Sequence, residues 1–527
     1  MISLIASQTD NEAANLTLAA LGRSLSQFQV RRLAAAALPS VNDPCVVAIN
    51  PSEEVGQQIL DWVGKGRRKA ILFGRLPPCL IGYLQMEACD WPVLLEERSR
   101  CAPAPTSGFT ESPCVIRYCD EAARLGAVGW RRPLERFDFT DEWNNLGYGA
   151  VRVDGSHWSL SLPLRASPAD ELASLDLDGE PALSYAACHD RAEASVLWFN
   201  RSVGPIDSFE WRLIENFLAH YRHDELACQP VLSEIPWGYD AAVTMRLDCD
   251  EDIESARSLW QCYQGMDVPF SLAVHTTNLS DERHHSILRE VRASGGAIVS
   301  HTATHAPNWG GSYEAAFHEG LMSKRLLEAI LGHPVVVAVS PFHQTPDYAL
   351  AALADAGYLA CIGGIIRNDP AFLLARSGHL AGMAEHFIGH SQQCMLHGDC
   401  MLQPGGDRLS VYKQAFDIAK QTRTFFGFLD HPFSARYQYG WSSELDRIHA
   451  HQDFISHIRS QSDRPLFLNI DQAMSFLRFR AQARVALHEG RVGYFSAAEE
   501  GPEAALTLAV EYNGELRQAE RIKSLQL

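Results

Sequence analysis

The sequence predicts an α/β protein with two unlike halves: a parallel-sheet α/β domain, then a (β/α) barrel with a small β appendage. Short apolar runs alternate with helical patterns in both halves, as in parallel sheets covered by helices. In the second half, roughly seven such runs over about 235 residues have the rhythm of a (β/α) barrel. After that, VGYFSAAE and ALTLAVEYNGEL predict the β appendage. We expect three parts, residues 1–235, 236–482 and 483–527, with a strand-rich stretch at about 110–165.

Composition narrows the class of protein. The chain has 527 residues, of which 46% are hydrophobic, and a formal net charge of −19. The apolar fraction is typical of a folded globular protein. The acidic balance argues against nucleic acid as a partner, because phosphate binding requires clustered Lys and Arg. No stretch approaches the roughly 20 apolar residues that span a bilayer.

The cysteines and the N-terminus predict a compartment. The 13 cysteines are scattered and contain no CxxC pair, which favours reduced thiols over a disulfide framework. The segment MISLIASQTDNEAANL has no basic region followed by a long apolar core, so it does not resemble a signal peptide. These features predict a cytoplasmic protein.

The N-terminal half alternates predicted strands and helices. Strands are predicted for ISLIA, PCVVAIN and KAILFG, and helices for NEAANLTLAALGRSL and EEVGQQILDWVGKG. SVLWFN followed by DSFEWRLIENFLAHYR predicts a strand that leads into a closing helix. Neither GxGxxG nor GxxxxGK[ST] is present, so no nucleotide site is expected. The arrangement loosely resembles glutamine-amidotransferase-like domains in architecture only, because it lacks a cysteine in a nucleophile elbow. We therefore expect an accessory or assembly domain.

The second half begins at PWGYD (236–240), where a turn is predicted. The predicted strands are AAVTMRL (241–247), PFSLAVH (269–275), GAIVS (296–300), PVVVAVSPF (334–342), YLACIGG (358–364), TFFGFLD (424–430) and PLFLNI (465–470). Predicted helices lie between many of them, notably YEAAFHEGLMSKRLLEAILG, PDYALAALADAGY and SSELDRIHAHQDFISHIRS.

Three groups of polar residues follow predicted strands of the barrel. Asp248 and Asp250 end the first strand, and their period-two spacing places both carboxylates on one side of an extended chain. His301 and His305 follow GAIVS, and His431 follows TFFGFLD. Because barrel active sites form at the carboxyl ends of strands, these residues can converge despite their separation in sequence.

This set of residue types suits amide hydrolysis. Two imidazoles and one carboxylate fit an open site for Zn²⁺ or a similar ion such as Co²⁺, Ni²⁺ or Mn²⁺. The second carboxylate is then free to accept a proton from water, and another histidine can protonate the departing amine.

The same pieces, in the same order, resemble the polysaccharide deacetylases, the family that includes chitin and peptidoglycan deacetylases. TMRLDCDED resembles an RxDxD form of the family's first motif, and HTATH at 301–305 matches H[ST]xxH. VSPFHQTPDYALAALADAGY resembles the third motif and its helix ending in Gly-Tyr. The resemblance covers residues 240–470 and implies a distorted (β/α) barrel.

The resemblance also implies a role for each residue. Asp248 corresponds to the catalytic base and His431 to the general acid, whereas Asp250, His301 and His305 correspond to the ligands of one divalent metal ion, Zn²⁺ above all.

The chain departs from the family pattern in two places. Where the third motif has an arginine that pairs with the base, this chain has Val339, so Arg246 or His343 is expected to orient Asp248 instead. The Asp-rich motif that often precedes the last family motif has no counterpart in LACIGGIIRNDP.

Further side chains are candidates for substrate binding. These are Pro341, Phe342, His343 and Trp309, together with His397 and Asp399. Aromatic rings stack on sugar faces, although Trp309 could equally pack in the core. His386 and His390 have the same spacing as His301 and His305 but lack an acidic motif upstream, so we interpret that pair as structural or solvated.

The sequence predicts metal-dependent hydrolysis of an acetyl group on a sugar or glycan, with N-acetyl favoured over O-acetyl. Two alternatives stay open: an amidase acting on a non-sugar amide or cyclic imide, and a catalytically silent carbohydrate-binding or assembly protein. Neither the sugar nor homo-oligomerisation is decided by the residues.

Overall fold

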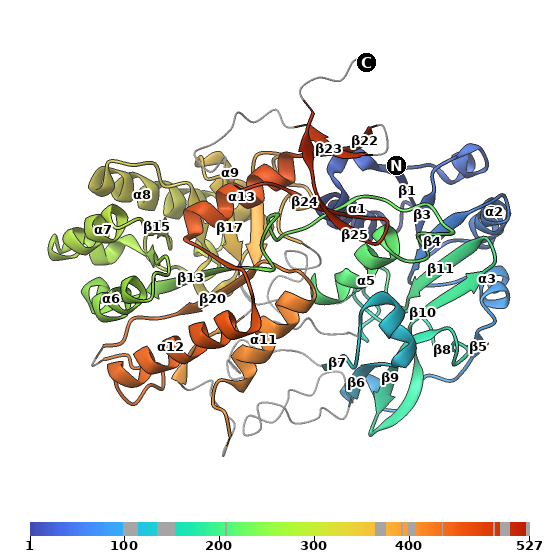
Figure 1. The fold of residues 1–527 in the computed structure, drawn as a ribbon, viewed down its shortest axis with the longest axis horizontal. Helices are drawn as coiled ribbons and strands as arrows, with labels where there is room; N and C mark the ends of the chain where they lie inside the picture. The colour runs from blue at the N-terminus through green and yellow to red at the C-terminus, as the bar shows by residue number, and fades with distance from the viewer. Residues whose placement is uncertain are drawn as a thin grey trace.

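The computed structural model describes residues 1–98, 114–133, 153–205, 208–363, 376–391, 394–398, 406–434, 436–488, 491–495 and 506–522. Figure 1 shows the N-terminal half beside the barrel, with the C-terminal strands β22 and β23 at the top and β24 and β25 between the two halves. The predicted α/β class is confirmed in both halves.

One mixed sheet forms the centre of the N-terminal half. Its strand order is β2-β1-β3-β4-β11-β10-β9-β6-β7. The strands are β1 (Ile2–Ala6), β2 (Val30–Arg32), β3 (Cys45–Ile49), β4 (Arg68–Phe73), β6 (Cys114–Tyr118), β7 (Arg131–Pro133), β9 (Glu171–Leu177), β10 (Glu180–Arg191) and β11 (Ala194–Phe199). The short strands β5 (Glu87–Ala88) and β8 (Leu164–Arg165) pair separately. The described part of the predicted strand-rich stretch contains β6, β7 and β8.

The sheet is parallel on one side only. Strands β2, β1, β3, β4 and β11 run parallel, as the sequence predicts, whereas β10, β9, β6 and β7 are antiparallel. The physical reason is connection length, because a two-residue loop can join only antiparallel strands. Asp178 and Gly179 form that loop between β9 and β10, with φ of 52° and 90°, as in a hairpin turn of type I′.

Helices cover this sheet. They are α1 (Asn11–Leu25), α2 (Glu53–Val63), α3 (Pro78–Tyr83), α4 (Leu95–Arg98) and the predicted closing helix α5 (Ser208–Ala219). Helix α2 begins at Ser52, whose hydroxyl accepts a hydrogen bond from Val55 N at 3.3 Å. Two glutamates in its first turn complement the helix dipole.

The barrel half is a curved parallel sheet. Its strand order is β18-β17-β16-β15-β14-β13-β20-β19, with β21 also pairing with β13. The strands are β13 (Ala241–Cys249), β14 (Ser271–Val274), β15 (Ala297–Ser300), β16 (Val337–Val339), β17 (Ala360–Gly363), β18 (Ile388–Ser391), β19 (Cys394–Met395), β20 (Phe426–Asp430) and β21 (Pro465–Leu468). All seven predicted strands are present, and β18 and β19 are additional.

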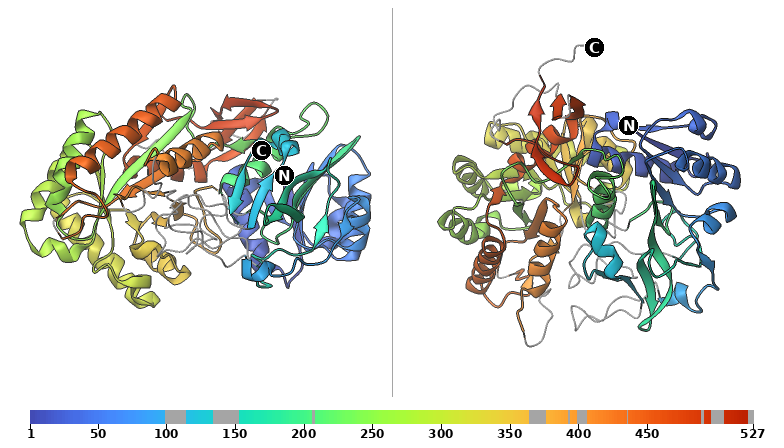
Figure 2. Two further views of the ribbon diagram at one scale, coloured as in Figure 1. Left: turned by 90° about the horizontal axis from the view of Figure 1, so that it is seen from below. Right: turned by 45° about the vertical axis from the view of Figure 1, so that its right-hand side comes forward.

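Chain continuity explains the curvature. The edge strands β18 and β19 stand at opposite ends of the sheet order, yet Ser391 and Cys394 are separated by only two residues. The sheet must therefore curl until its edges approach, which gives the distorted barrel that the sequence predicts. Figure 2 shows helices around the outside of this sheet.

The described helices of the barrel half are α6 (Arg257–Gly265), α7 (Arg283–Ala293), α8 (Tyr313–Leu331), α9 (Asp347–Asp355), α11 (Ser410–Gln421), α12 (Glu444–Gln461) and α13 (Ile470–Gln482). Helices α8, α9 and α12 agree with the three segments named in the prediction. Ser312 caps the start of α8 and Gly332 ends it with φ 63°, a left-handed conformation that glycine adopts at low cost. None of the described helices is long and apolar enough to cross a membrane.

The C-terminal residues form two small sheets, β22-β23-β26 and β12-β24-β25. The strands are β12 (Val231–Leu232), β22 (Arg484–His488), β23 (Arg491–Phe495), β24 (Ala509–Tyr512), β25 (Glu515–Gln518) and β26 (Glu520–Arg521). Since β12 lies between the two halves in sequence, the appendage pairs with their connection.

Glu511 of β24 binds basic residues of both halves. Its carboxylate accepts hydrogen bonds from Arg212 of α5 at 2.8 and 2.6 Å, contacts His220, and lies 3.3 Å from Arg423 of the barrel. Burial alone would raise the pKa of Glu511, but Arg212 and these other bases outweigh it and hold that pKa below its ordinary value. The Glu511 carboxylate is therefore ionised in the folded protein near neutral pH.

Glu511→Gln should lower the free energy of unfolding by about 3 kcal/mol at neutral pH, because it removes the carboxylate that Arg212 and Arg423 share and leaves Arg212 with Glu215 alone. The folded pKa lies below the unfolded value of about 4.3. The contribution of Glu511 is therefore complete above that pH and is lost as the pH falls below it. Urea unfolding at about pH 7 and about pH 3.5 measures this difference and its decrease in acid.

The matched control is Glu515→Gln on the neighbouring strand β25, where the glutamate side chain is 67% exposed. Its effect should stay within about 0.5 kcal/mol. Equal effects of the two substitutions at neutral pH would contradict a structural role for Glu511.

Candidate metal centre and active site

The site lies at the carboxyl ends of adjacent parallel strands. Strand β13 pairs with β20, which places Leu247 opposite Asp430, and also with β14, which places Asp248 opposite Ala273. Strand β14 in turn places Val274 opposite Ser300 of β15. The residues that follow these strand ends therefore meet at one edge of the sheet.

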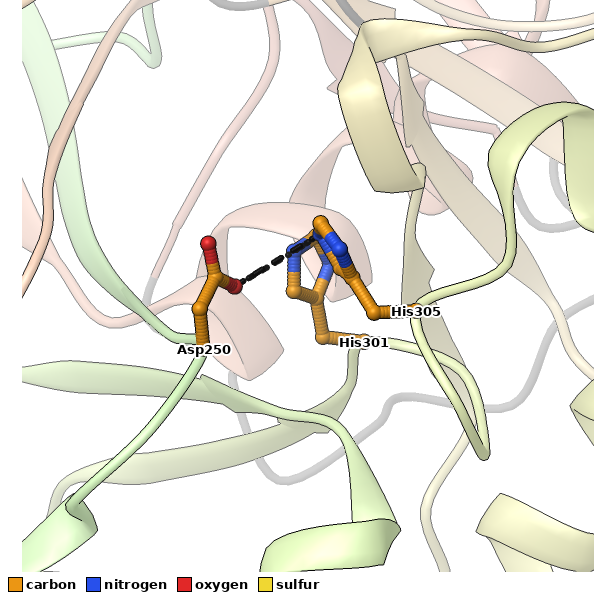
Figure 3. Close-up of side chains that lie close together, drawn as sticks. All are labelled: Asp250, His301 and His305. Carbon is orange, nitrogen blue, oxygen red and sulfur yellow. Dashed lines mark hydrogen bonds and ion pairs between the residues drawn. The ribbon is translucent and has the colours of Figure 1, made fainter.

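Asp250, His301 and His305 form the centre of the site. Their candidate ligand atoms all lie within 4.8 Å of one another. Asp250 Oδ1 is 3.5 Å from Nε2 of each histidine, and the two Nε2 atoms are 3.1 Å apart. Figure 3 shows the three side chains pointing toward a common point. The structure thus brings together the three predicted ligands.

Main-chain contacts orient two of these side chains. His301 Nδ1 lies 3.1 Å from the carbonyl oxygen of Val339. If Nδ1 carries the hydrogen, Nε2 presents its lone pair to the centre, which is the usual outer contact of a metal-binding histidine. His275 Nε2 lies 2.6 Å from the carbonyl oxygen of Asp250 and holds the chain at that residue.

The loop that carries His305 is anchored by a buried glutamate of α8. Glu319 accepts hydrogen bonds from Ala303 N at 2.9 Å, from Thr304 N at 2.8 Å and from Thr304 Oγ1 at 2.7 Å. His305 has φ 57°, a left-handed conformation that is sparsely populated outside glycine. Such conformations persist where surrounding contacts enforce them, often at functional sites. The sequence signal for Glu319 is a glutamate on the inner face of a predicted helix.

These residues fit a divalent cation. Asp250 Oδ1 is buried and accepts no hydrogen bond from any residue that the structure describes. Burial, and then His301, lower the pKa of His305 to about 4, so its ring is neutral near pH 7, as a ligand must be. A carboxylate oxygen and two imidazole nitrogens are ordinary ligands of Zn²⁺ and leave further positions open.

Asp248 is paired with Arg246 from the same strand. Arg246 Nε donates to Asp248 Oδ1 at 2.6 Å, and a terminal nitrogen donates to Oδ2 at 3.1 Å. Burial alone would raise the pKa of Asp248, but Arg246 and then His301 outweigh it, so the net shift is downward. The family arginine that pairs with the base is replaced by Val339 in this chain, and the prediction that Arg246 can orient Asp248 instead is confirmed. His343 does not have this role, because its Nε2 faces Met395 Sδ at 3.2 Å.

His431 faces the centre from the opposite side. Its Nε2 lies 3.4 Å from Asp250 Oδ2. Burial would lower the pKa of His431, but Asp250 and Asp248 outweigh it and raise that pKa in the metal-free site. The carboxylates of Asp248 and Asp250 thus concentrate negative charge beside His431, where a cation would bind.

A second acidic and imidazole group lies behind the first. His397, Asp430 and His431 are close enough for shared ligation. However, Asp430 Oδ2 is 2.9 Å from His451 Nε2 and 3.6 Å from a terminal nitrogen of Arg447, both fully buried. A fixed positive charge beside the only carboxylate of this group disfavours a second cation there.

A polar groove extends outward from Asp250. It has a volume of about 750 Å³. Its lining residues are Asp250, Glu251, Asp252, Glu254, Asn278, Arg283, His284, Ser286 and Arg436. Several of these charges are already paired, since Arg436 lies 3.4 Å from Glu251 and His284 lies 3.1 Å from Asp252. The groove therefore suits a polar ligand that carries no large charge.

The residues predicted to bind substrate differ in their exposure and in their distance from the centre. The half-buried Phe342 has its ring 4.5 Å from that of His305 and borders the centre. Pro341 and His343 are buried in the same turn. The prediction that Trp309 stacks on a sugar is wrong: its ring is fully buried and its indole nitrogen donates to Gln344 O at 3.0 Å, so it packs in the core.

The remaining histidines and Asp399 can also be placed. His397 is buried against His431, at 2.7 Å. His390 is buried and contacts Ser377 Oγ at 2.7 Å, in agreement with the structural interpretation. Asp399 lies outside the described residues.

Comparison with known proteins supports the predicted resemblance. The polysaccharide deacetylase family profile matches residues 254–361. The match includes His301 and His305, begins after Asp250 and ends before His431. It confirms that the second half resembles this family, and it supports a carbohydrate deacetylase domain. No curated protein matches the sequence.

Several solved structures are similar to the barrel half at low identity. A Mycobacterium smegmatis protein assigned as a polysaccharide deacetylase has 15% identity and a TM-score of 0.38 over 46% of this chain and 92% of its own. A family 4 acetyl xylan esterase from Clostridium thermocellum, bound to cobalt, has 12% identity and a TM-score of 0.30 over 44% and 90%. A family pseudoenzyme from Bacillus anthracis has 13% identity and a TM-score of 0.30 over 44% and 65%.

Metal binding is testable with a single carboxylate substitution. The wild type should bind about one equivalent of Zn²⁺ or Co²⁺, and Asp250→Asn should weaken binding by at least about 100-fold, more than the loss of an outer contact costs. Elemental analysis after dialysis and competitive titration measure both quantities. Asp252→Asn is the matched control in the same groove and should leave affinity unchanged. Equal metal content in the wild type and Asp250→Asn would exclude Asp250 as a ligand.

Proposed function

We propose that this protein is a metal-dependent deacetylase that hydrolyses acetyl groups, N-acetyl above all, on a carbohydrate of surface-polysaccharide or glycoconjugate metabolism. One observation carries the proposal: a trio of candidate metal ligands, Asp250, His301 and His305, lies next to His431 and two residues from Asp248, a carboxylate held by Arg246. The coarser assignment to carbohydrate deacetylation rests on the family match at residues 254–361.

The chain supplies a base and an acid at separate positions. A divalent cation bound by Asp250, His301 and His305 would supply Lewis acidity to the acetyl carbonyl and to the attacking water. Asp248 is ionised near neutral pH and accepts the proton of that water, while Arg246 fixes its orientation. His431, on the other side of Asp250, donates a proton to the departing nitrogen. Acetate and a free amine are the products.

The groove supports a glycan substrate over a small enclosed amide. Its polar lining includes side chains that are largely exposed, such as Arg283 and Arg436. Substrate portions beyond the reacting acetyl group can extend along such a surface, whereas a small amide is better held in a closed pocket. A cytoplasmic location, which we retain from the cysteine pattern, would favour a lipid-linked or nucleotide-linked sugar. Detection of the protein outside the cytoplasm would contradict that part.

Acetate release from chitopentaose, compared with hydrolysis of p-nitrophenyl acetate, tests the two assigned roles. Asp248→Asn should lower kcat for both substrates by about 100-fold or more, because both reactions need the water deprotonated. His431→Ala should lower kcat for chitopentaose similarly but spare the ester within about tenfold, because p-nitrophenolate departs without a proton. His386→Ala, an exposed histidine, is the control and should leave both rates unchanged.

Three outcomes would change the assignment. Metal-loaded wild type that releases no acetate from chitopentaose or acetylated xylan, but hydrolyses a cyclic imide, would indicate an amidase. Glycan binding without any turnover would indicate a silent binding protein. Equal losses on both substrates in His431→Ala would remove the acid role from His431.

A further inference from the structure

The imidazole ring of His431 could adopt either of two orientations related by a half-turn. In the observed orientation its two nitrogens face different partners. Nε2 lies 3.4 Å from Asp250 Oδ2, on the side of the metal centre. Nδ1 lies 2.7 Å from Nε2 of His397, on the buried side. A half-turn of the ring about its Cβ–Cγ bond would exchange nitrogen for carbon at both places. The contact at Nδ1, the shorter of the two, therefore favours the orientation in which Nε2 reaches the site.

Apart from these two ring contacts, the contacts of His431 hold the residue without selecting the orientation of its ring. Its backbone nitrogen donates to Asp430 Oδ1 at 2.7 Å, and its carbonyl accepts from Arg447 at 2.7 Å. The ring of Tyr439 stacks on it at 4.3 Å between centroids and 19° between planes. Backbone bonds and a flat stacked ring allow the half-turn. Among the described residues, only His397 is hydrogen-bonded to Nδ1.

His397 is itself fixed in place. It is 1% exposed, which excludes the substrate contact predicted from the sequence. Its carbonyl accepts from Tyr412 Oη at 3.1 Å. The next residue, Gly398, donates to Tyr439 O at 2.9 Å, and a Cβ there would lie 2.4 Å from the carbonyl carbon of Gly440. The chain at 397–398 and the loop at 439–440 are therefore packed backbone to backbone.

We propose that His397 is a positioning residue, which holds the His431 ring with Nε2 toward the scissile bond. The inference rests on the proposed function, because it assigns the residue that makes His431 an effective acid. In a hydrogen bond between two imidazole rings, one nitrogen donates its hydrogen and the other accepts with its lone pair. The buried His397 can therefore fix the orientation of the His431 ring without touching the substrate itself. Outer contacts of this kind typically change activity by about 10–100-fold.

His397→Phe and His397→Gln test the inference. Phenylalanine keeps a planar ring but cannot hydrogen-bond, so kcat for acetate release from chitopentaose should fall by about 10–100-fold with KM and metal content unchanged. Glutamine offers an amide to Nδ1 and should restore kcat to within about fivefold of the wild type. Hydrolysis of p-nitrophenyl acetate should change by less than about threefold in both variants, because that leaving group needs no acid.

The outcomes separate a positioning role from a structural one. Equal loss on both substrates, or loss of metal, in His397→Phe would show that His397 only supports the fold. Unchanged kcat for chitopentaose in that variant would overturn the inference as well.

A crystal structure of His397→Phe decides the matter without activity. A His431 ring that has turned Nε2 away from Asp250 supports the inference, and an unchanged ring overturns it. If the metal-loaded wild type releases no acetate, the proposed function has failed, and this structure still reports on the role of His397.

Discussion

Parallel pairing around β13 is the constraint on which the site depends. β13 is paired with β14 on one side and β20 on the other, so Asp248 and Asp250 end up between the histidines that follow β15 and β20. A shift of one residue in either pairing would turn the carboxylates to the opposite face of the sheet, since side chains alternate along a strand. The geometry of the site therefore depends first on the register of these strands and only then on the residues of each local motif.

Burial gives the charges of this site their strength. Asp248 and Arg246 are both buried and bonded to each other, and Asp430 is bonded to His451, which in turn contacts Tyr263. Ionised groups removed from water are costly unless they are paired. Asp250 Oδ1 is the buried carboxylate oxygen of the central trio that is left without a hydrogen bond among the described residues. An oxygen in this position fits the cation that we propose for the site, because a bound cation would supply the missing partner.

Local sequence patterns predicted the strands and motifs, whose residues lie close together in the sequence. They missed features that depend on tertiary packing. The seven barrel strands follow from periodicity, and the candidate ligand trio follows from motif and spacing. Arg246 is one of two partners expected for Asp248. Strands β18 and β19 lie in the stretch EHFIGHSQQCML, where polar residues interrupt the apolar ones, so no continuous apolar run marks them. The side chains of Trp309 and His397 could have faced the substrate or the core, and only packing shows that both are buried. The antiparallel side of the N-terminal sheet did have a local signal, Asp178-Gly179, which predicts a hairpin.

The connection between the halves also takes part in closing the barrel. Glu234 is buried, and one of its oxygens accepts from Ser377 N at 2.6 Å while the other accepts from Phe425 N at 2.9 Å. Ser377 precedes Gly378, which bridges to Gly389 in the edge strand β18, whereas Phe425 precedes β20, the neighbour of the other edge. One carboxylate thus bonds to segments beside both edges of the curved sheet. The N-terminal half reinforces this point, because Glu215 of α5 binds Arg376 at 2.8 Å. A boundary drawn at residue 235 marks a change of fold, and the contacts across it hold the barrel at the start of β20 and of β18. They support the sheet from its amino-terminal side, whereas the site is built at the carboxyl ends of the strands.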